Sequence, residues 1–519
     1  MAKTEILFVF ILILMSTMGY SMAGNAGYFW QISDLHMDQN YSIRGDSKHM
    51  CHGNMSNSTI SPYGNYNCDA PWDLIKDTIS AMKFFHPTPD FILWTGDIMP
   101  HLPDKDVTWS EVFSGLFNAT NQMLKTFPGH ILLPVIGNHD VHPANLFPET
   151  GFDEVYVNYL TKAKWGNLIP NDQHVNFVKG GYYVKKIDNQ LQIIVMNTNI
   201  YLSHNKEKPK SEDPGGQLQW LKDQLISAKI NSYKVIITAH APPGYFERNP
   251  IEPFLVSPYS EKFVQLVIDY ADVILTQVYG HTHTDTFRLF MDSHGVVRSH
   301  GFIAPSVSPL KITATNGINP SIRLYSYDVA ENMVLDYEQY YLNISDVTGS
   351  GYWNRDKYER ANVELPWKLL YTATELYGVN NLNLLSLYHV YLDISTNREL
   401  FEKYYLYNVA GVKTESCSET CHRIHICAIT ELTKTDMDKC MNFHHFSTSP
   451  AYTVKPTDGH SRPVPANRKL ISRQMRFVIL GVALGLFIML IIMTVIASVF
   501  CVRRKFSTGF RYQKHNVLQ

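Results

Sequence analysis

The feature that most constrains this chain is an apolar run that stops abruptly in polar side chains able to bind metals or move protons. Residues 132–136 are apolar, and Gly137-Asn138-His139-Asp140 follows them directly. Four other apolar runs end in the same manner, and the polar residues after them are Asp34 and His36, Asp97, His240, and His281 with His283. In open α/β sheets, ligands bind outside the carboxyl ends of the strands. The pattern therefore predicts one active site assembled from five strand ends.

The residue types at these strand ends predict two bound cations. In an extended segment, side chains two residues apart point the same way, so Asp34 and His36 are expected to share one side. The same is expected of His281 and His283. Two-metal sites hold their ions about 3.5–4 Å apart, and the carboxylate of Asp97 suits the position between them. Imidazole, carboxylate and amide donors favour borderline divalent ions such as zinc, manganese or iron.

In chain order, these blocks resemble the signature of the calcineurin-like metallophosphoesterases. The resemblance implies two divalent metal ions, with zinc as the expected metal and Asp97 bridging them. The ligand sets that it implies are Asp34, His36 and His283 for one ion, and Asn138, His240 and His281 for the other. His139 would stay off the metals.

The flanking residues narrow the resemblance to the acid sphingomyelinase-like phosphodiesterases. It is carried by residues 31–36, 240–244, 283–288 and 319–323, and it extends from about residue 27 to Cys440. His101 occupies the position of a second active-site histidine in the sphingomyelinase group. The family implies an α/β fold with two facing mixed β-sheets flanked by helices. A smaller, mostly helical C-terminal region with disulfides would follow.

The resemblance implies hydrolysis of a phosphodiester by a hydroxide that bridges the metals. Such a reaction needs a proton for the leaving oxygen, and a histidine off the metals can supply it. We assign this role to His139, with His101 second. Only ten residues separate Ala23 from Asp34, which leaves no room for the saposin domain that precedes the catalytic domain of sphingomyelinase itself. Nucleotides and related small phosphodiesters are therefore the expected substrates. The alternatives are a sphingomyelin phosphodiesterase and a cell-surface receptor or signalling regulator on the same fold.

The first 23 residues have the pattern of a secretory signal peptide, with Lys3 before a short apolar core and small residues at Ser21 and Ala23. A first membrane span is the weaker interpretation, because the apolar core is shorter than the ~20 residues that a span needs. Glycosylation sequons fit the same route and lie at Asn40, Asn54, Asn57, Asn118 and Asn343.

The cysteines also fit an oxidising compartment. Cys51 and Cys68 bracket a loop rich in Gly, Asn and Ser, and we expect them to form a disulfide. Four more lie close together, and their spacing allows three pairings or a zinc site: Cys417, Cys421, Cys427 and Cys440. The resemblance favours Cys417–Cys421 and Cys427–Cys440.

Apolar periodicity predicts alternating strands and helices across a catalytic domain at residues 24–330. Helices are expected at 72–85, 110–125, 217–228 and 259–270, and further strands at 182–186, 192–198, 286–291 and 322–328. Residues 331–450 are predicted to form a smaller, mostly helical region. After one last strand-like run, helical stretches are expected there at 358–377, 382–392 and 398–407.

The end of the chain predicts a membrane anchor. Residues 451–476 suit a solvated stalk, residues 477–502 carry no charge and are long enough for one transmembrane helix, and residues 503–519 form a polar tail. Together with the signal peptide, this predicts a single-pass type I membrane protein at the cell surface or in endolysosomes, with a cytosolic tail. The formal net charge of −2 gives no indication of a nucleic-acid partner.

Overall fold

Two six-stranded β-sheets lie at the centre of the part of the chain that this computed structural model describes, which comprises residues 26–53, 60–250, 252–312, 315–347 and 366–442. The first sheet has the strand order β12 (Trp367–Thr372), β11 (Met333–Leu342), β10 (Ser321–Asp328), β1 (Gly27–Ile32), β2 (Phe91–Trp94) and β3 (Ile131–Pro134). The second has the order β4 (Tyr183–Lys186), β5 (Leu191–Val195), β6 (Lys234–Thr238), β7 (Ile274–Tyr279), β9 (Val297–Ile303) and β8 (Thr286–Met291).

Both sheets are mixed, as predicted. In the first, β1, β2 and β3 run parallel, whereas β10 pairs antiparallel with β1. In the second, β5, β6, β7 and β9 run parallel and the two edge strands are antiparallel. Every residue of β2 is buried, which is typical of a parallel strand covered on both faces. The parallel order brings the carboxyl ends of the strands with polar termini to the same edge.

The two sheets pack against each other through β1 and β10 on one side and β7 and β9 on the other. The Gln31 amide donates to the carbonyl of Tyr279 at 2.8 Å and accepts from the Tyr325 hydroxyl at 3.0 Å. The rings of Phe302 and Tyr325 lie 5.7 Å apart. These contacts fix the distance between strand ends that come from different sheets.

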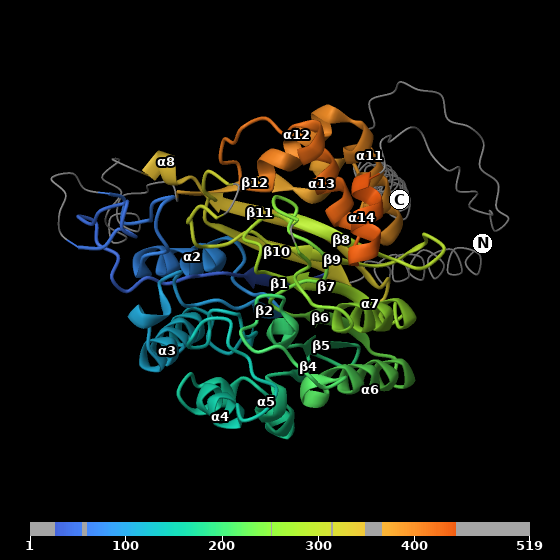
Figure 1. Ribbon diagram of the computed structural model, residues 1–519, viewed down its shortest axis with the longest axis horizontal. Helices are drawn as coiled ribbons and strands as arrows, with labels where there is room; N and C mark the ends of the chain where they lie inside the picture. Colours follow the sequence, from blue (N-terminus) through green and yellow to red (C-terminus); the bar gives the residue numbers. More distant parts are fainter. Residues whose placement is uncertain (1–25, 54–59, 251, 313–314, 348–365, 443–519) are drawn as a thin grey trace, which may run out of the picture. The chain divides into compact units, whose positions relative to one another are not determined.

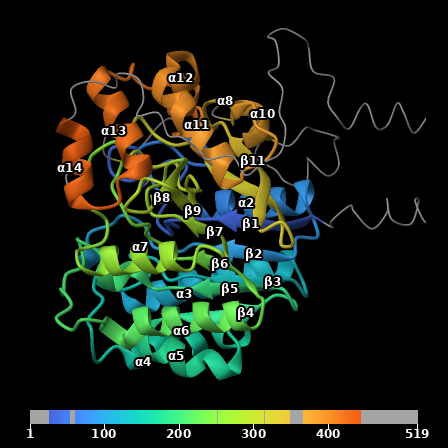
Figure 2. The ribbon, with the colours of Figure 1, turned by 90° about the vertical axis from the view of Figure 1, so that its right-hand side faces the viewer.

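Helices cover the outer sides of the sheets (Figures 1 and 2). α2 (Trp72–Phe85) packs on β10, and α3 (Trp109–Thr126) packs on α2, whereas α6 (Gln217–Ile230) and α7 (Tyr259–Asp269) cover the second sheet. α3 begins with a capping box between Thr108 and Glu111. The four predicted helices are confirmed within two residues at each end. Two further helices follow β3 in the chain, α4 (Asp153–Thr161) and α5 (His174–Gly180), and they pack on each other, with α5 next to β4.

The predicted helix at residues 358–377 is wrong at residues 367–372 and confirmed at residues 373–377, and residues 358–365 lie outside the described part of the chain. Residues 367–372 form β12, which pairs antiparallel with β11, and only the short helix α10 (Ala373–Tyr377) follows it. Trp367 and Tyr371 point inward, but Leu369 is 49% exposed, so the alternation that indicates a strand is broken at this sheet edge. β11 and β12 follow residue 330 and yet belong to the first sheet.

The remaining described helices lie together near β8 and β12 (Figure 1). They are α11 (Leu384–Thr396), α12 (Arg398–Tyr407), α13 (Glu419–Thr430) and α14 (Lys434–Asn442). Apart from this group, α8 (Ile344–Val347) is a single turn that follows β11. The structure contains the three expected disulfides, Cys51–Cys68, Cys417–Cys421 and Cys427–Cys440. The last two join α13 to the residues on either side of it.

The predicted signal peptide, stalk, transmembrane helix and tail lie outside the described residues, as do the sequons Asn54 and Asn57. Among the helices that the structure does describe, none has the length and apolar character needed to cross a membrane. Of the remaining sequons, Asn40 and Asn118 are exposed and Asn343 is half-buried.

Candidate metal centre

The seven predicted metal ligands lie together at the carboxyl ends of β1, β2, β3, β6 and β7. We call them the histidine cluster: Asp34, His36, Asp97, Asn138, His240, His281 and His283. All seven follow strands whose residues are almost entirely buried, so the sheets carry the polar side chains into the protein interior. Strand ends from both sheets contribute, which explains why residues far apart in the sequence meet.

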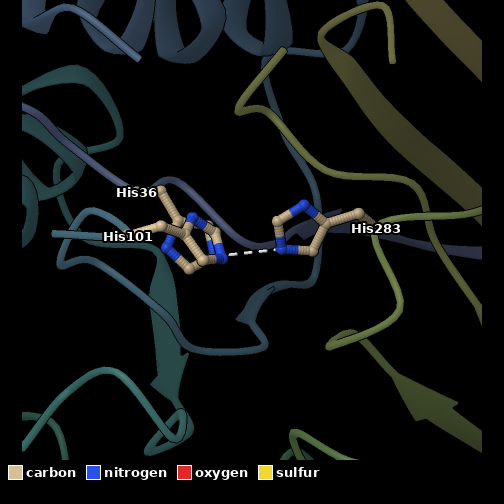
Figure 3. Close-up of side chains that lie close together, drawn as sticks. All are labelled: His36, His101 and His283. Atoms are coloured by element: carbon tan, nitrogen blue, oxygen red, sulfur yellow. Dashed lines mark hydrogen bonds between the residues drawn. The ribbon is translucent and has the colours of Figure 1, made fainter. Parts of the chain in front are cut away.

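One half of the cluster contains two histidines and two carboxylates. The Nε2 atoms of His36 and His283 are 3.0 Å apart (Figure 3). His36 Nε2 lies 3.5 Å from Asp97 Oδ2, and His283 Nε2 lies 3.7 Å from Asp34 Oδ1. All four side chains are at most 4% exposed.

The other half contains two histidines and an amide. Asn138 Oδ1 is 2.8 Å from His240 Nε2 and 2.8 Å from His281 Nδ1, and these two nitrogens are 3.2 Å apart. Asp97 Oδ2 lies 3.2 Å from His240 Nε2. The same carboxylate oxygen thus faces both halves, which is the place expected for a bridging ligand.

The protonation pattern of the cluster fits bound cations. His36 Nδ1 lies 2.6 Å from the carbonyl oxygen of Met99, and His240 Nδ1 lies 2.7 Å from that of Thr95. A carbonyl only accepts, so each Nδ1 carries a proton, and each Nε2 is the ring nitrogen that faces the cluster and can bind a cation when it holds no proton. Backbone partners orient metal-binding histidines in this manner. Lone pairs and carboxylate oxygens that face one another at about 3 Å need positive charge between them.

Burial and crowding shift the pKa values within the cluster in opposite directions. Burial raises the pKa of Asp34 to about 7. Attraction to His240 opposes this shift, and repulsion from Asp97 adds to it. Burial and the charge of His240 lower the pKa of His281 to about 3. Burial also opposes the charge on His240, but attraction to Asp97 and Asp34 raises its pKa to about 9. Cations would relieve these effects, because they stabilise ionised carboxylates and neutral imidazoles together.

The backbone at the cluster is left-handed, and this corrects the prediction of extended segments. Five of its residues have positive φ although none is glycine: Asp34 (51°), His36 (37°), Asp97 (61°), His281 (72°) and His283 (61°). Such conformations are uncommon for residues with a side chain and cost of order 1–3 kcal/mol each. The paired ligands converge because the chain turns sharply after each strand, and not because alternate residues of a strand share a face.

Asp140 is not among the predicted site residues, but it holds two of the turns together. Its carboxylate accepts hydrogen bonds from the backbone N–H of Gly137 at 2.7 Å, Ile98 at 2.7 Å and Asp97 at 3.0 Å. A Cβ atom on Gly137 would lie 2.0 Å from Asp97 Oδ1, so glycine is required at that position. Asp140 therefore positions the shared carboxylate.

Asn145 is a second residue that sequence reasoning missed. Its Oδ1 accepts from the Asn138 amide nitrogen at 3.1 Å, and its backbone N–H donates to the Asn138 carbonyl at 2.8 Å. The first bond fixes which amide atom of Asn138 faces the cluster. Asn145 has a φ of 63°, which asparagine tolerates better than most residues.

The two predicted proton donors lie beside the histidine cluster. The ring of His101 is 4.0 Å from that of His36 (Figure 3). It is 4.6 Å from the ring of His139. Burial and the charge of His101 lower the pKa of His139 to about 4. Burial also acts against a charge on His101, but the carboxylate of Asp69 raises its pKa above the ordinary value. The protonated form is therefore more favoured at His101 than at His139.

A second buried group of charges includes Asp285, which lies two residues after His283. We call it the arginine cluster: Glu247, Asp285, Arg288 and Arg323. Arg288 pairs with Glu247 at 3.3 Å, and Arg323 pairs with Asp285. Asn408 joins the two pairs, because its amide donates to Glu247 Oε1 at 2.9 Å and to the Asp285 carbonyl at 2.8 Å. The residue stretches around Asp285 and Arg323, which carried the family resemblance, thus form a structural support behind the histidines.

Comparisons with known proteins agree with this geometry. Residues 27–285 match the family model described as calcineurin-like phosphoesterase, and residues 297–447 match that of the acid sphingomyelin phosphodiesterase C-terminal region. The chain is 35% identical to human "Acid sphingomyelinase-like phosphodiesterase 3b" over 78% of its own length and 88% of that protein's length. It is 32% identical to human "Cyclic GMP-AMP phosphodiesterase SMPDL3A" (80% and 90%), and 30% identical to "Sphingomyelinase phosphodiesterase C" of Dictyostelium discoideum (84% and 97%).

Proposed function

Since this chain belongs to the acid sphingomyelinase-like phosphodiesterases, a metal-dependent family of hydrolases that act on phosphodiester bonds, we propose that it hydrolyses nucleotides and related small phosphodiesters. A similar protein is named for cleaving cyclic GMP-AMP, a nucleotide phosphodiester. The observation that carries the proposal is the convergence of six other potential metal ligands around the single carboxylate of Asp97.

The histidine cluster would hold two divalent cations, and zinc fits its donors. Asp34, His36 and His283 would bind one ion. The second ion would be bound by Asn138, His240 and His281. When bound, such ions act as Lewis acids on the phosphoryl oxygens and make a water nucleophilic at neutral pH. The chain itself orients two of the donor histidines, since the backbone carbonyls of Met99 and Thr95 hold His36 and His240.

His101 and His139 would supply the proton that the leaving oxygen needs. Their rings are 4.6 Å apart, and the backbone N–H of His139 donates to Asp97 Oδ1 at 2.7 Å, which places both beside the shared carboxylate. His139 was the first candidate in the sequence. The structure adds a reason to give His101 equal weight, since Asp69 favours its protonated form.

The purified full-length protein tests this function. We expect two metal ions per chain by elemental analysis, and hydrolysis of nitrophenyl-thymidine phosphate that a chelator abolishes. In a comparison of ATP, CDP-choline and sphingomyelin, nucleotide substrates should have the highest kcat/KM. Faster cleavage of sphingomyelin would make the protein a lipid phosphodiesterase. Neither metal nor turnover would make it a binding protein on this fold.

We further infer that the catalytic domain is tethered to a membrane with the metal centre on the extracellular or lumenal side. The uncharged segment at residues 477–502 and the three disulfides support this. In cells, the protein should resist alkaline carbonate extraction and lose mass on removal of N-linked glycans. Recovery in the carbonate-soluble fraction would contradict the tether.

A further inference from the structure

We propose that Asp69 is the positioning residue of the proton donor His101, an inference that rests on the proposed phosphodiesterase activity. Asp69 is fully buried, and one of its oxygens accepts from the backbone N–H of His101 at 2.7 Å. The same oxygen lies 3.1 Å from His101 Nδ1. Backbone and side chain of His101 are thus held by one carboxylate.

This pairing sets the tautomer of His101. An ionised carboxylate only accepts hydrogen bonds, so Nδ1 carries a proton and Nε2 is the atom left for chemistry. A ring nitrogen of His101 lies within 4.8 Å of nitrogens of both His36 and His283. Figure 3 shows the His101 ring beside that of His36, facing His283. Without the carboxylate, a turn about χ2 would exchange the two ring nitrogens.

Asp69 is itself fixed from three directions. The preceding residue, Cys68, is bonded to Cys51. The following residue, Ala70, donates its backbone N–H to the carbonyl of His36 at 3.0 Å. Ser308 donates its hydroxyl to Asp69 Oδ1 at 2.7 Å. The disulfide-bridged loop is therefore attached directly to the segment that carries a metal ligand, and it delivers the carboxylate behind His101.

The same loop contains a matched control. His52 Nε2 lies 2.6 Å from Asp38 Oδ2, so this pair has the chemistry of the Asp69–His101 pair. The His52 side chain is 30% exposed and is not among the histidines grouped at the metal centre in the described part of the chain. A change there alters a histidine–carboxylate pair in the loop without altering a proton donor.

The test compares Asp69→Asn with His52→Gln in the full-length protein. The asparagine side chain has nearly the same size as aspartate, but its amide no longer demands a proton on Nδ1 of His101. We expect kcat to fall about 10²- to 10⁴-fold with KM and metal content unchanged, because loss of a carboxylate that sets the tautomer of a catalytic histidine can cost about 10⁴ in kcat. The loss should be larger for a dinucleoside monophosphate, whose leaving group is a nucleoside hydroxyl that needs a proton, than for nitrophenyl-thymidine phosphate, because nitrophenolate leaves without one. His52→Gln should behave as the wild type.

A second comparison separates positioning from folding. If Asp69 acts only through His101, then Asp69→Asn added to His101→Ala should cause little further loss. Should Asp69→Asn fail to fold, Ser308→Ala removes one support of the carboxylate and should show a smaller loss with the same dependence on the leaving group.

Three outcomes would overturn the inference. The first is equal activity in Asp69→Asn and His52→Gln. The second is loss of metal from Asp69→Asn, which would make His101 a ligand. The third is an equal loss for good and poor leaving groups, which would indicate a structural role. A wild-type protein without metal or turnover would instead overturn the proposed function, and this result is seen before any variant is made.

Discussion

The histidine cluster and the arginine cluster are two buried groups of charge that lie almost side by side in the sequence, with only Thr284 between His283 and Asp285. In the arginine cluster, the cations belong to the chain, since Arg288 and Arg323 face Glu247 and Asp285. In the histidine cluster, the carboxylates face the Nε2 atoms of imidazoles whose Nδ1 atoms are held by backbone carbonyls.

The difference shows that the arginine cluster can support the structure while the histidine cluster remains available to bind cations. A carboxylate paired with a guanidinium is satisfied and unavailable, because arginine keeps its charge at any accessible pH. A carboxylate surrounded by neutral imidazoles remains open to an exchangeable cation and to substrate. The predictions below ask whether the two clusters can be disturbed independently.

Removal of the metals should have the largest effect on activity. Dialysis against a chelator should abolish phosphodiester hydrolysis, because the water and the phosphoryl oxygens lose the charge that activates them. The far-ultraviolet circular dichroism should change little, since the arginine cluster and both sheets need no metal. Return of zinc should restore turnover. Loss of secondary structure on chelation would show that the two clusters are not independent.

His139→Ala should reduce kcat about 10²- to 10⁴-fold, the range for loss of a general acid. Metal content should stay at two ions, because the His139 side chain is not among the groups that can hold a metal in the described part of the chain. The loss should be greatest for substrates with poor leaving groups. Lower metal content measured by elemental analysis would make His139 a ligand.

Arg323→Gln should destabilise the protein by about 3–5 kcal/mol, because it leaves the Asp285 carboxylate buried without its counterion. Urea unfolding measures this free energy. Lys206→Gln is the control, since Lys206 pairs with Asp104 where both side chains are 42% exposed, and its loss should cost at most about 1 kcal/mol. Equal costs for the two variants would contradict the structural role of the arginine cluster.

Asn145→Gly should weaken metal binding about 10- to 100-fold, as expected on loss of a residue that orients a ligand. Glycine tolerates the positive φ at this position, so only the acceptor of the Asn138 amide is removed. Asn145→Asp keeps an acceptor and should bind metal nearly as the wild type does. Competition with a chromophoric chelator measures both affinities, and equal weakening would show that the hydrogen bond is not the cause.

His425→Phe should change only the pH dependence of stability. His425 is fully buried, and neither ring nitrogen has a hydrogen-bond partner among the described residues. Burial lowers its pKa to about 3, whereas the unfolded chain protonates near the ordinary value of 6.5. The unfolded state therefore binds more protons below pH 6.5, and stability falls as the pH drops toward 3.

Urea unfolding at pH 7.5 should give nearly equal free energies for the wild type and His425→Phe, because phenylalanine keeps the edge contacts with Tyr404 and Tyr405. At pH 4.5, the variant should be more stable by about 2 kcal/mol. His49→Gln, at a histidine that is 79% exposed, should show no such gain. A constant difference between the two pH values would rule out titration of His425.

The strands that carry the ligands could be predicted from the sequence, because each is a buried apolar run that ends in a metal-binding residue. β2 and β3 are the clearest cases. A short apolar run can be a buried helix or a buried strand, and the length of these two runs favours a strand. β12 could not be predicted, because its conformation depends on hydrogen bonds offered by β11 and not on its own pattern.

The residues that hold the ligands were harder to find than the ligands. Asp140 acts on backbone groups of Asp97 and Ile98, and Asp69 acts on a histidine 32 positions away. Neither contact leaves a periodicity or a spacing in the sequence. The left-handed turns were missed for the same reason, since Asp and His at positive φ are imposed by the surrounding structure.

The sheet that begins with β1 is completed by β11 and β12, and Asn408 is bonded to the loop that follows His283. The two stretches matched by separate family descriptions are therefore interwoven. A lineage that acquired only the earlier stretch would inherit the chelating residues without the neighbours that hold them in place. Shuffling among relatives should succeed only when both stretches are exchanged as one heritable block.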